Sequence, residues 1–180
     1  AAQPFETHHN ALGLDMFLRI APELYLKRLL VGGFEKVFEL NRSFRNEGIS
    51  HKHNPEFTML DTYEAYADYS KVMDDVETLV SWLASEIGYE GELQFEAPWP
   101  RIPLAEAIKE QTGIDILEHR ERQALAQEMV DKGFHHELPD DSWPQLVDEL
   151  LSKHVEPKLK HPTFITDYPV ELSPFAKEHR

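Results

Sequence analysis

Cysteine is absent from this chain of 180 residues, and its absence removes several kinds of chemistry. Disulfide bonds, thiolate metal sites and a cysteine nucleophile are all excluded. Long apolar runs are missing too: no stretch of about 18 apolar residues occurs, so no membrane-spanning helix is predicted. Neither a Walker A sequence nor G-x-G-x-x-G is found. The two common glycine-rich modes of phosphate binding are therefore excluded as well.

Positive charge is scarce. The chain has 18 Lys and Arg against 33 Asp and Glu, which gives a formal net charge of −15. A protein this acidic does not hold nucleic acid nonspecifically over its whole surface. The deficit is uneven, because residues 1–54 contain seven basic and six acidic residues and carry +1, whereas the remaining 126 residues carry −16. An anionic ligand is therefore expected in the first third of the chain.

The composition is that of a globular protein, with 41% hydrophobic and 11% aromatic residues. This is enough to build a core and argues against disorder. The sequence begins with Ala1 rather than Met and shows no signal-peptide pattern there. We therefore expect an internal segment of a longer protein, one domain or part of one in size.

Hydrophobic periodicity predicts an α+β fold. Residues 36–47 and 56–67 alternate between apolar and polar positions, as consecutive strands do. Helices that begin with Pro22, Pro103 and the caps Ser70 and Ser142 fit the usual start signals. The predicted elements are helices over 22–32, 70–87, 103–111, 118–132 and 142–154, and short strands over 92–97 and 162–168. This order favours an antiparallel β-sheet flanked by helices.

One stretch, Phe44 to Thr58, is rich in side chains that can bind ligands or take part in a reaction: F-R-N-E-G-I-S-H-K-H-N-P-E-F-T. The Arg45 guanidinium suits a phosphate or carboxylate, and Phe57 offers a ring on which a purine can stack. A loop containing Lys52 adds cationic donors. Together these residues predict a nucleoside triphosphate site. From composition and period alone, the alternative is a solvated sheet face with cross-strand ion pairs and Phe57 in the core.

The same stretch resembles motif 2 of the class II lysyl-tRNA synthetases of bacterial type. The flanking stretches F-E-T-H-H-N-A, L-R-I-A-P-E-L-Y-L-K-R, Y-E-A-Y-A-D-Y and P-T-F-I-T-D-Y-P resemble the same family. The resemblance is strong over residues 1–70, diffuse over 90–155 and strong again over 156–177. It implies part of a class II catalytic domain, with the motif 2 hairpin at about 36–68 and a helical insertion at about 103–155.

For ATP, the resemblance implies a set of binding residues in and around the hairpin loop. Arg45 matches the arginine that meets the α-phosphate and the amino-acid carboxylate, and is the expected catalytic residue. Glu47 matches the motif glutamate beside ATP. His53 and Asn54 match loop residues near the phosphates and adenine, and Phe57 matches the ring that stacks on adenine.

For lysine, the resemblance implies Glu23 at the α-amino group, Arg45 at the carboxylate, and Asp61 with Tyr63 at the ε-ammonium group. The family more often has Glu where Asp61 stands. Because Asp is one methylene shorter, its contact with the ammonium group could pass through a water molecule.

The resemblance also implies partners and parts outside the chain. The expected reaction is lysine–tRNA ligation with ATP and tRNA(Lys), by a cytoplasmic homodimer with no membrane association. Mg²⁺ ligands are expected outside this segment, as are motif 1, motif 3 and the N-terminal anticodon-binding domain. The isolated segment should be inactive. A His/Glu/Asp-rich stretch at 135–141 is interpreted as solvated rather than as a metal site.

Two other functions compete with this one. The first is the synthetase paralogue that lysylates elongation factor P, which shares much of motif 2 and lacks the anticodon domain. The second is a non-catalytic module that binds an adenylate or a partner. An intact motif 3 arginine downstream would favour catalysis over the binding module.

Overall fold

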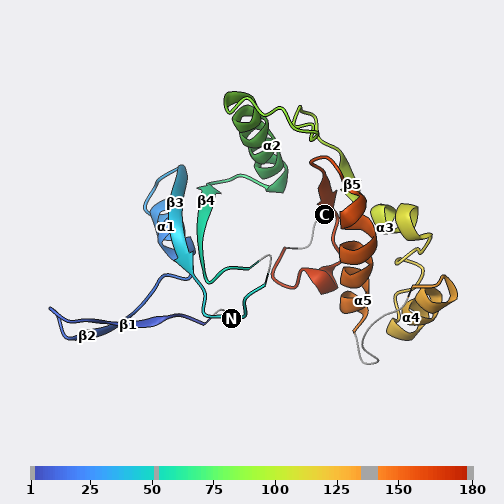
Figure 1. Ribbon diagram of the computed structural model, residues 1–180, viewed down its shortest axis with the longest axis horizontal. Helices are drawn as coiled ribbons and strands as arrows, with labels where there is room; N and C mark the ends of the chain where they lie inside the picture. Colours follow the sequence, from blue (N-terminus) through green and yellow to red (C-terminus); the bar gives the residue numbers. More distant parts are fainter. Residues whose placement is uncertain (1–2, 51–52, 135–141, 178–180) are drawn as a thin grey trace. The chain divides into compact units, whose positions relative to one another are not determined.

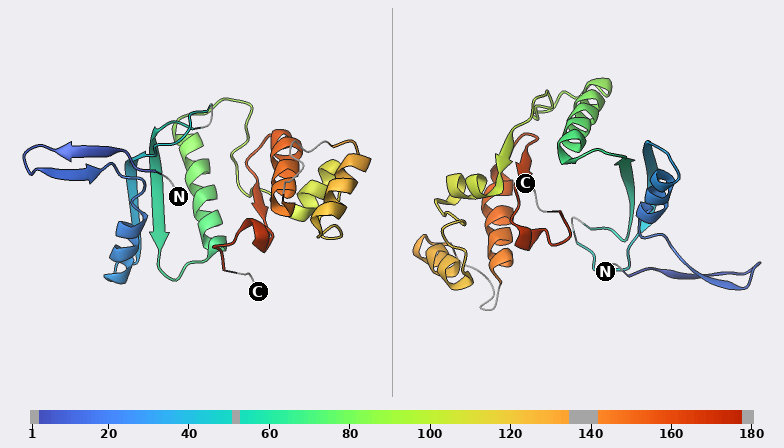
Figure 2. Two further views of the ribbon diagram at one scale, coloured as in Figure 1. Left: turned by 90° about the horizontal axis from the view of Figure 1, so that it is seen from below. Right: turned by 180° about the vertical axis from the view of Figure 1, so that it is seen from behind.

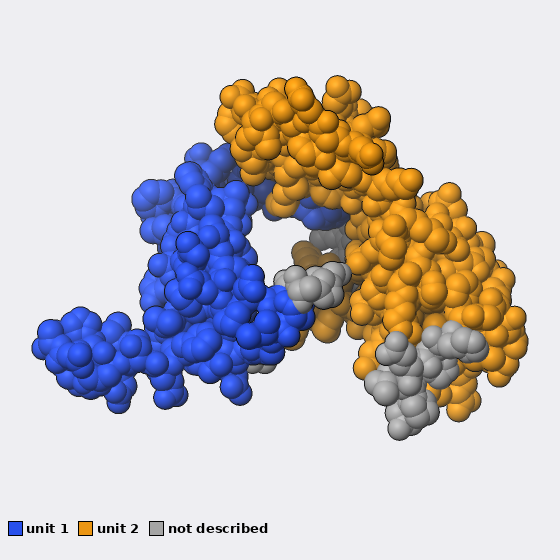
Figure 3. Space-filling view, in the orientation of Figure 1, with its two compact units in different colours: residues 1–69 blue, residues 70–180 orange. Residues whose placement is uncertain are grey.

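The computed structural model describes residues 3–50, 53–134 and 142–177. It is an α+β structure, as predicted, and divides into two compact units, residues 1–69 and 70–180 (Figure 3). Among the described residues, no helix combines the length and the apolar character that crossing a membrane requires. The stretch 135–141, interpreted above as solvated, and Lys52 lie outside the described residues.

The first unit consists of two antiparallel hairpins and one helix (Figure 1). Its elements are β1 (Glu6–His9), β2 (Leu14–Phe17), α1 (Glu23–Val31), β3 (Lys36–Phe44) and β4 (Glu56–Glu64). The β1–β2 hairpin was not predicted from sequence. Its turn ends at Gly13, whose φ of 60° is the left-handed conformation that glycine adopts at no steric cost. Every residue of both short strands is exposed, so no alternation of burial marks them.

The β3–β4 hairpin confirms the predicted pair of alternating strands. Its register places Glu39 opposite Asp61 and Ser43 opposite Phe57. Within the unit, the buried face of β3 is the polar one: Ser43 is fully buried, whereas Phe38 on the other face is 73% exposed. Helix α1 contacts both strands and buries Leu26 (Figure 2). The sequence pattern gave the two faces correctly, and the structure shows that the polar one is covered.

The second unit contains the helical core. Its elements are α2 (Tyr69–Glu86, beginning at the boundary), β5 (Arg101–Pro103), α3 (Leu104–Thr112), α4 (Arg122–Asp131), α5 (Trp143–Leu150), the π-helical turn η1 (Leu151–Val155), the 3-10 turns η2 (Glu156–Lys158) and η3 (Val170–Leu172), and β6 (Phe164–Thr166). Apolar side chains of α3, α4, α5 and η1 form one continuous cluster. Burial of this cluster is the main stabilising contribution in the unit.

Most helix boundaries match the prediction, with three differences. Residues 92–97 form no strand; the strand lies at β5 instead and pairs in parallel with β6, so the sheet content is not wholly antiparallel. Ser70 is the second residue of α2 rather than its cap. Helix α4 begins at Arg122, four residues later than predicted, because residues 115–118 form a separate turn.

Candidate active site

The alternation of β4 places Phe57, Asp61 and Tyr63 on one face of the β3–β4 hairpin. All three side chains are half-buried, as is Met59 on the same face, whereas Thr58, Leu60 and Thr62 on the other face are exposed. The first turn of α1 contributes Glu23 to the same region, since Glu23 and Asp61 both act electrostatically on Tyr63. The hairpin and α1 therefore bring together four of the residues singled out in the sequence.

Arg45 follows the last residue of β3 and lies against Phe57. Its guanidinium carbon is 5.3 Å from the centroid of the Phe57 ring, a cation–π distance. The Nε atom of Arg45 is buried and has no hydrogen-bond partner. No ion pair between Arg45 and a described carboxylate is found, and the cross-strand ion pairs of the hairpin include Lys36–Glu64 and Arg42–Glu56 instead. Such a guanidinium keeps its fork of donors available to an anionic ligand.

The loop between β3 and β4 is closed by backbone bonds. The Arg45 amide donates to the Pro55 carbonyl at 2.9 Å, and Ser50 and His53 exchange two backbone bonds at 3.2 Å. The His53 ring lies 2.8 Å from the Ser50 hydroxyl. Glu47 and Asn54 are exposed, like His53. The structure thus brings Arg45 and Phe57 together and places Glu47, His53 and Asn54 along the loop, where Glu47 meets Arg45 only through its backbone amide, which donates to the Arg45 carbonyl at 3.0 Å.

Tyr63 lies in an acidic setting with one cation. Burial raises the pKa of its hydroxyl, and the charges of Glu23 and Asp61 raise it further, while Lys27 opposes them. The Lys27 ammonium is 6.0 Å from the Tyr63 ring centroid. Its hydrogen bond to Glu23 raises the pKa of Lys27. Lys27 was missed from sequence, although its position four residues after Glu23 on a helix is the usual signal of such a pair.

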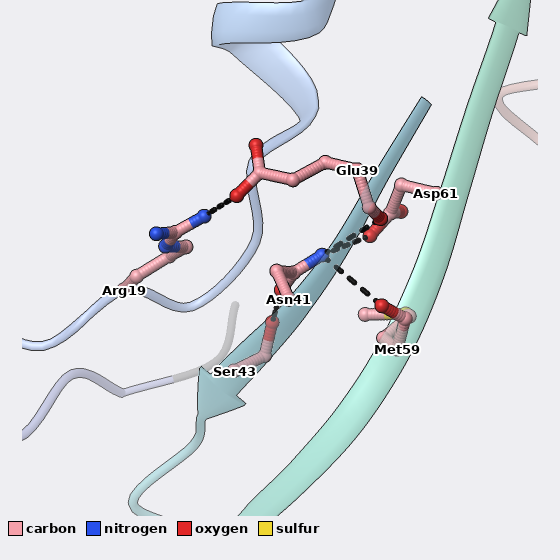
Figure 4. A network of polar contacts seen from close by, with 6 residues as sticks. All are labelled: Arg19, Glu39, Asn41, Ser43, Met59 and Asp61. Carbon is pink, nitrogen blue, oxygen red and sulfur yellow. Dashed lines mark hydrogen bonds and ion pairs between the residues drawn. The ribbon is translucent and has the colours of Figure 1, made fainter. Parts of the chain in front are cut away.

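A buried polar network lies beside Asp61 (Figure 4). The Asn41 side-chain nitrogen is 3.0 Å from Asp61 Oδ2, and the Ser43 hydroxyl donates to Asn41 Oδ1 at 2.7 Å. Glu39, opposite Asp61 in the register, is ion-paired with Arg19. Asp61 itself has no ion pair among the described residues. The sequence reasoning missed Asn41 and Ser43, whose only signal was a polar residue at alternate strand positions.

The site therefore combines an available cation at the end of β3 with an available carboxylate and a tyrosine hydroxyl further along β4. One end suits phosphate or carboxylate, and the other suits an ammonium group. Among the described residues, no group of three or more His, Asp or Glu side chains is placed to hold a metal ion.

Comparison with known proteins defines the class of this site. Residues 1–180 match the family described as tRNA synthetases class II (D, K and N), and the chain belongs to that family. It is 55% identical over 185 residues to a lysine–tRNA ligase of Pelotomaculum thermopropionicum, covering 98% of this chain and 37% of the relative. It is 50% identical to lysine–tRNA ligases of Dehalococcoides mccartyi, over 98% of this chain and 37% of the relative, and of Carboxydothermus hydrogenoformans, over 100% and 38%.

All three relatives are lysine–tRNA ligases, the type of class II synthetase that motif 2 predicted. The chain spans a little over a third of their length. The family is therefore established for this chain.

Proposed function

We propose that this chain is part of the catalytic domain of a lysine–tRNA ligase, which activates lysine with ATP and transfers it to tRNA(Lys). The observation that carries the proposal is the charge arrangement of the β3–β4 hairpin. Arg45 lacks a carboxylate partner and Asp61 lacks a cationic one among the described residues. A lysine molecule carries the complementary groups, a carboxylate at one end and an ammonium at the other.

In the proposed first step, a carboxylate oxygen of lysine bonds to the α-phosphorus of ATP, and the bond to pyrophosphate breaks in line. The products are lysyl-adenylate and pyrophosphate. Such a transfer depends on alignment and charge stabilisation rather than on covalent help from the protein. Arg45 would neutralise the negative charge on the reacting groups. No general base is needed, because the lysine carboxylate is already ionised at neutral pH.

In the second step, the terminal ribose hydroxyl of tRNA attacks the activated carbonyl, and AMP leaves. The names of the relatives favour tRNA over elongation factor P as the acceptor. Nothing observed favours a non-catalytic module.

For lysine, we assign Asp61 and Tyr63 to the ε-ammonium group and Glu23 to the α-amino group. The Glu23 carboxylate accepts a hydrogen bond from one ammonium group, that of Lys27. The α-amino group of a bound lysine would exchange with it. Because the Glu23–Lys27 pair is exposed, that exchange costs little free energy.

For ATP, we assign Phe57 to the adenine ring and Glu47, His53 and Asn54 to the loop that approaches the nucleotide. We place the Mg²⁺ ligands that the family implies outside this segment. The hairpin at about 36–68 and the helical insertion at about 103–155 are proposed as subdivisions of one catalytic domain. The full-length protein is proposed to act as a cytoplasmic homodimer.

The test is amino-acid-dependent exchange between pyrophosphate and ATP, measured with the full-length protein that carries this chain. Lysine should support exchange, whereas aspartate and asparagine, the other two amino acids of the family description, should not. A carboxylate at position 61 repels the side-chain carboxylate of aspartate, and the neutral side chain of asparagine offers it no opposite charge. Exchange driven by aspartate or asparagine, or by no amino acid, would overturn the proposal.

A further inference from the structure

Two fully or nearly buried polar residues lie on β3 beside Asp61. Asn41 is 7% exposed and Ser43 is 0% exposed, and no other polar residue of the described chain is as buried. A buried polar group destabilises a fold unless it is hydrogen-bonded. In a hairpin with so few buried apolar residues, two such groups on one face suggest a task beyond packing.

The orientation of the Asn41 amide is determined by its surroundings (Figure 4). Three acceptors surround its nitrogen: the Glu39 carbonyl at 3.4 Å, the Met59 carbonyl at 3.3 Å and Asp61 Oδ2 at 3.0 Å. The Ser43 hydroxyl donates to its oxygen at 2.7 Å. With the amide reversed, oxygen would face three oxygens. The nitrogen must therefore point toward Asp61, and Ser43 keeps it there.

This arrangement leaves the charge of Asp61 intact. Arg19 is paired with Glu39, the residue opposite Asp61, and Asp61 has no ion pair among the described residues. Asp61 receives a neutral amide donor at Oδ2, which orients the carboxylate without cancelling its charge. The other carboxylate oxygen has no hydrogen bond to a described residue. A carboxylate held in one orientation, still charged and only half-buried, is arranged to receive a cation.

We propose that Asn41, itself oriented by Ser43, is a positioning residue that holds Asp61 for the ε-ammonium group of bound lysine. The inference rests on the proposed function, since lysine is the ligand it assumes. Asn41 and Ser43 are not among the lysine-binding residues that the resemblance to motif 2 implies. Because an aspartate reaches less far than a glutamate, its orientation must be fixed more tightly for the same contact, and the amide supplies that constraint.

The experiment compares KM for lysine with KM for ATP in the pyrophosphate exchange reaction of the full-length protein. Asn41→Ala should raise KM for lysine about tenfold or more, the scale of a lost hydrogen bond to a charged group, and leave KM for ATP unchanged. Ser43→Ala should shift the same parameter in the same direction by a smaller factor. Thr62→Val is the matched control: it adjoins Asp61 on β4 but lies on the exposed face.

A double-mutant cycle separates positioning from structure. In an Asp61→Asn background, Asn41→Ala should change KM for lysine less than about twofold, because the carboxylate it positions is gone. Additive effects, or an equal rise in both KM values with a lower melting temperature, would overturn the inference. If Asn41→Ala fails to fold, Ser43→Ala tests the same inference, because it should raise KM for lysine and leave KM for ATP unchanged. Absence of lysine-dependent exchange in the unaltered protein would instead overturn the proposed function.

Discussion

The two units of this chain are stabilised in different ways. In residues 1–69 the only buried large apolar side chain among the described residues, apart from prolines, is Leu26, and the buried residues of the hairpin are the polar Asn41 and Ser43. In residues 70–180, apolar side chains of four helical segments form a continuous cluster. The first unit thus holds charged and hydrogen-bonding groups in defined positions, while the second provides ordinary hydrophobic stability. The candidate binding groups lie in residues 1–69 and the core residues in residues 70–180. Substitutions in the first unit should therefore mainly change activity, and substitutions in the second should mainly change stability.

The largest expected effect is that of Arg45→Ala on activity. In the full-length protein it should lower lysine-dependent pyrophosphate exchange by roughly 100-fold or more, on the scale of a lost transition-state donor. The melting temperature should hardly change, because Arg45 makes no ion pair with a described residue and its Nε lacks a partner. The matched control is Arg42→Ala, which removes an exposed pair with Glu56 on the other face. Near-normal exchange by the Arg45 variant would refute the assignment.

The next effect is on stability, in the other unit. Leu150 is fully buried in the helical cluster, so Leu150→Ala should lower the free energy of unfolding by about 2–5 kcal/mol. Leu117→Ala, at a position that is 53% exposed, should cost far less. Chemical denaturation of the chain measures both. Equal losses would show that the cluster is not the main source of stability, and the contrast between the units would fail.

The sequence predicted the elements well where a strong periodic signal met a clear boundary. Alternation over 36–47 and 56–67 identified both strands of the hairpin, because a strand with two chemically different faces has period two whichever face is covered. The β1–β2 hairpin has no such signal, since its strands are exposed on both faces. The prediction of a strand at 92–97 was wrong. The residues that become extended are those of β5, because they pair in parallel with the distant segment β6.

For the candidate site, sequence identified the charged residues but not the groups that hold them. Arg45, Phe57, Asp61 and Tyr63 stand out through residue type and resemblance to a motif. Asn41 and Ser43 do not, because their importance depends on the strand register, which places Asn41 within reach of Asp61 and orients it by a second contact. Register is a property of two strands together and cannot be read from either one.

A smaller effect concerns the start of α5. The Gln145 side-chain oxygen accepts from the Ser142 amide at 2.8 Å and from the Ser142 hydroxyl at 2.7 Å, so the predicted cap is in place. Ser142→Ala should lower the free energy of unfolding by about 1 kcal/mol, typical of a lost N-terminal cap. In a Gln145→Ala background the same substitution should cost less, because the shared acceptor is gone. Full additivity in denaturation experiments would contradict this account.

The smallest effect is a pH dependence of stability in the second unit. The hydrogen bond from Lys109 and the Leu117 amide lower the pKa of Asp115 below its usual 3.8. A carboxyl whose pKa is lower in the folded state stabilises the fold above the pKa of the unfolded state, and that stabilisation is lost as the pH falls through the folded-state value. Asp115→Asn should therefore lower the melting temperature slightly at pH 7, and the difference should shrink as the pH is taken below 3.8. Lys109→Gln, which removes the partner, should show the same trend. A difference that stays constant over this range would mean that the contribution of Asp115 does not come from its charge.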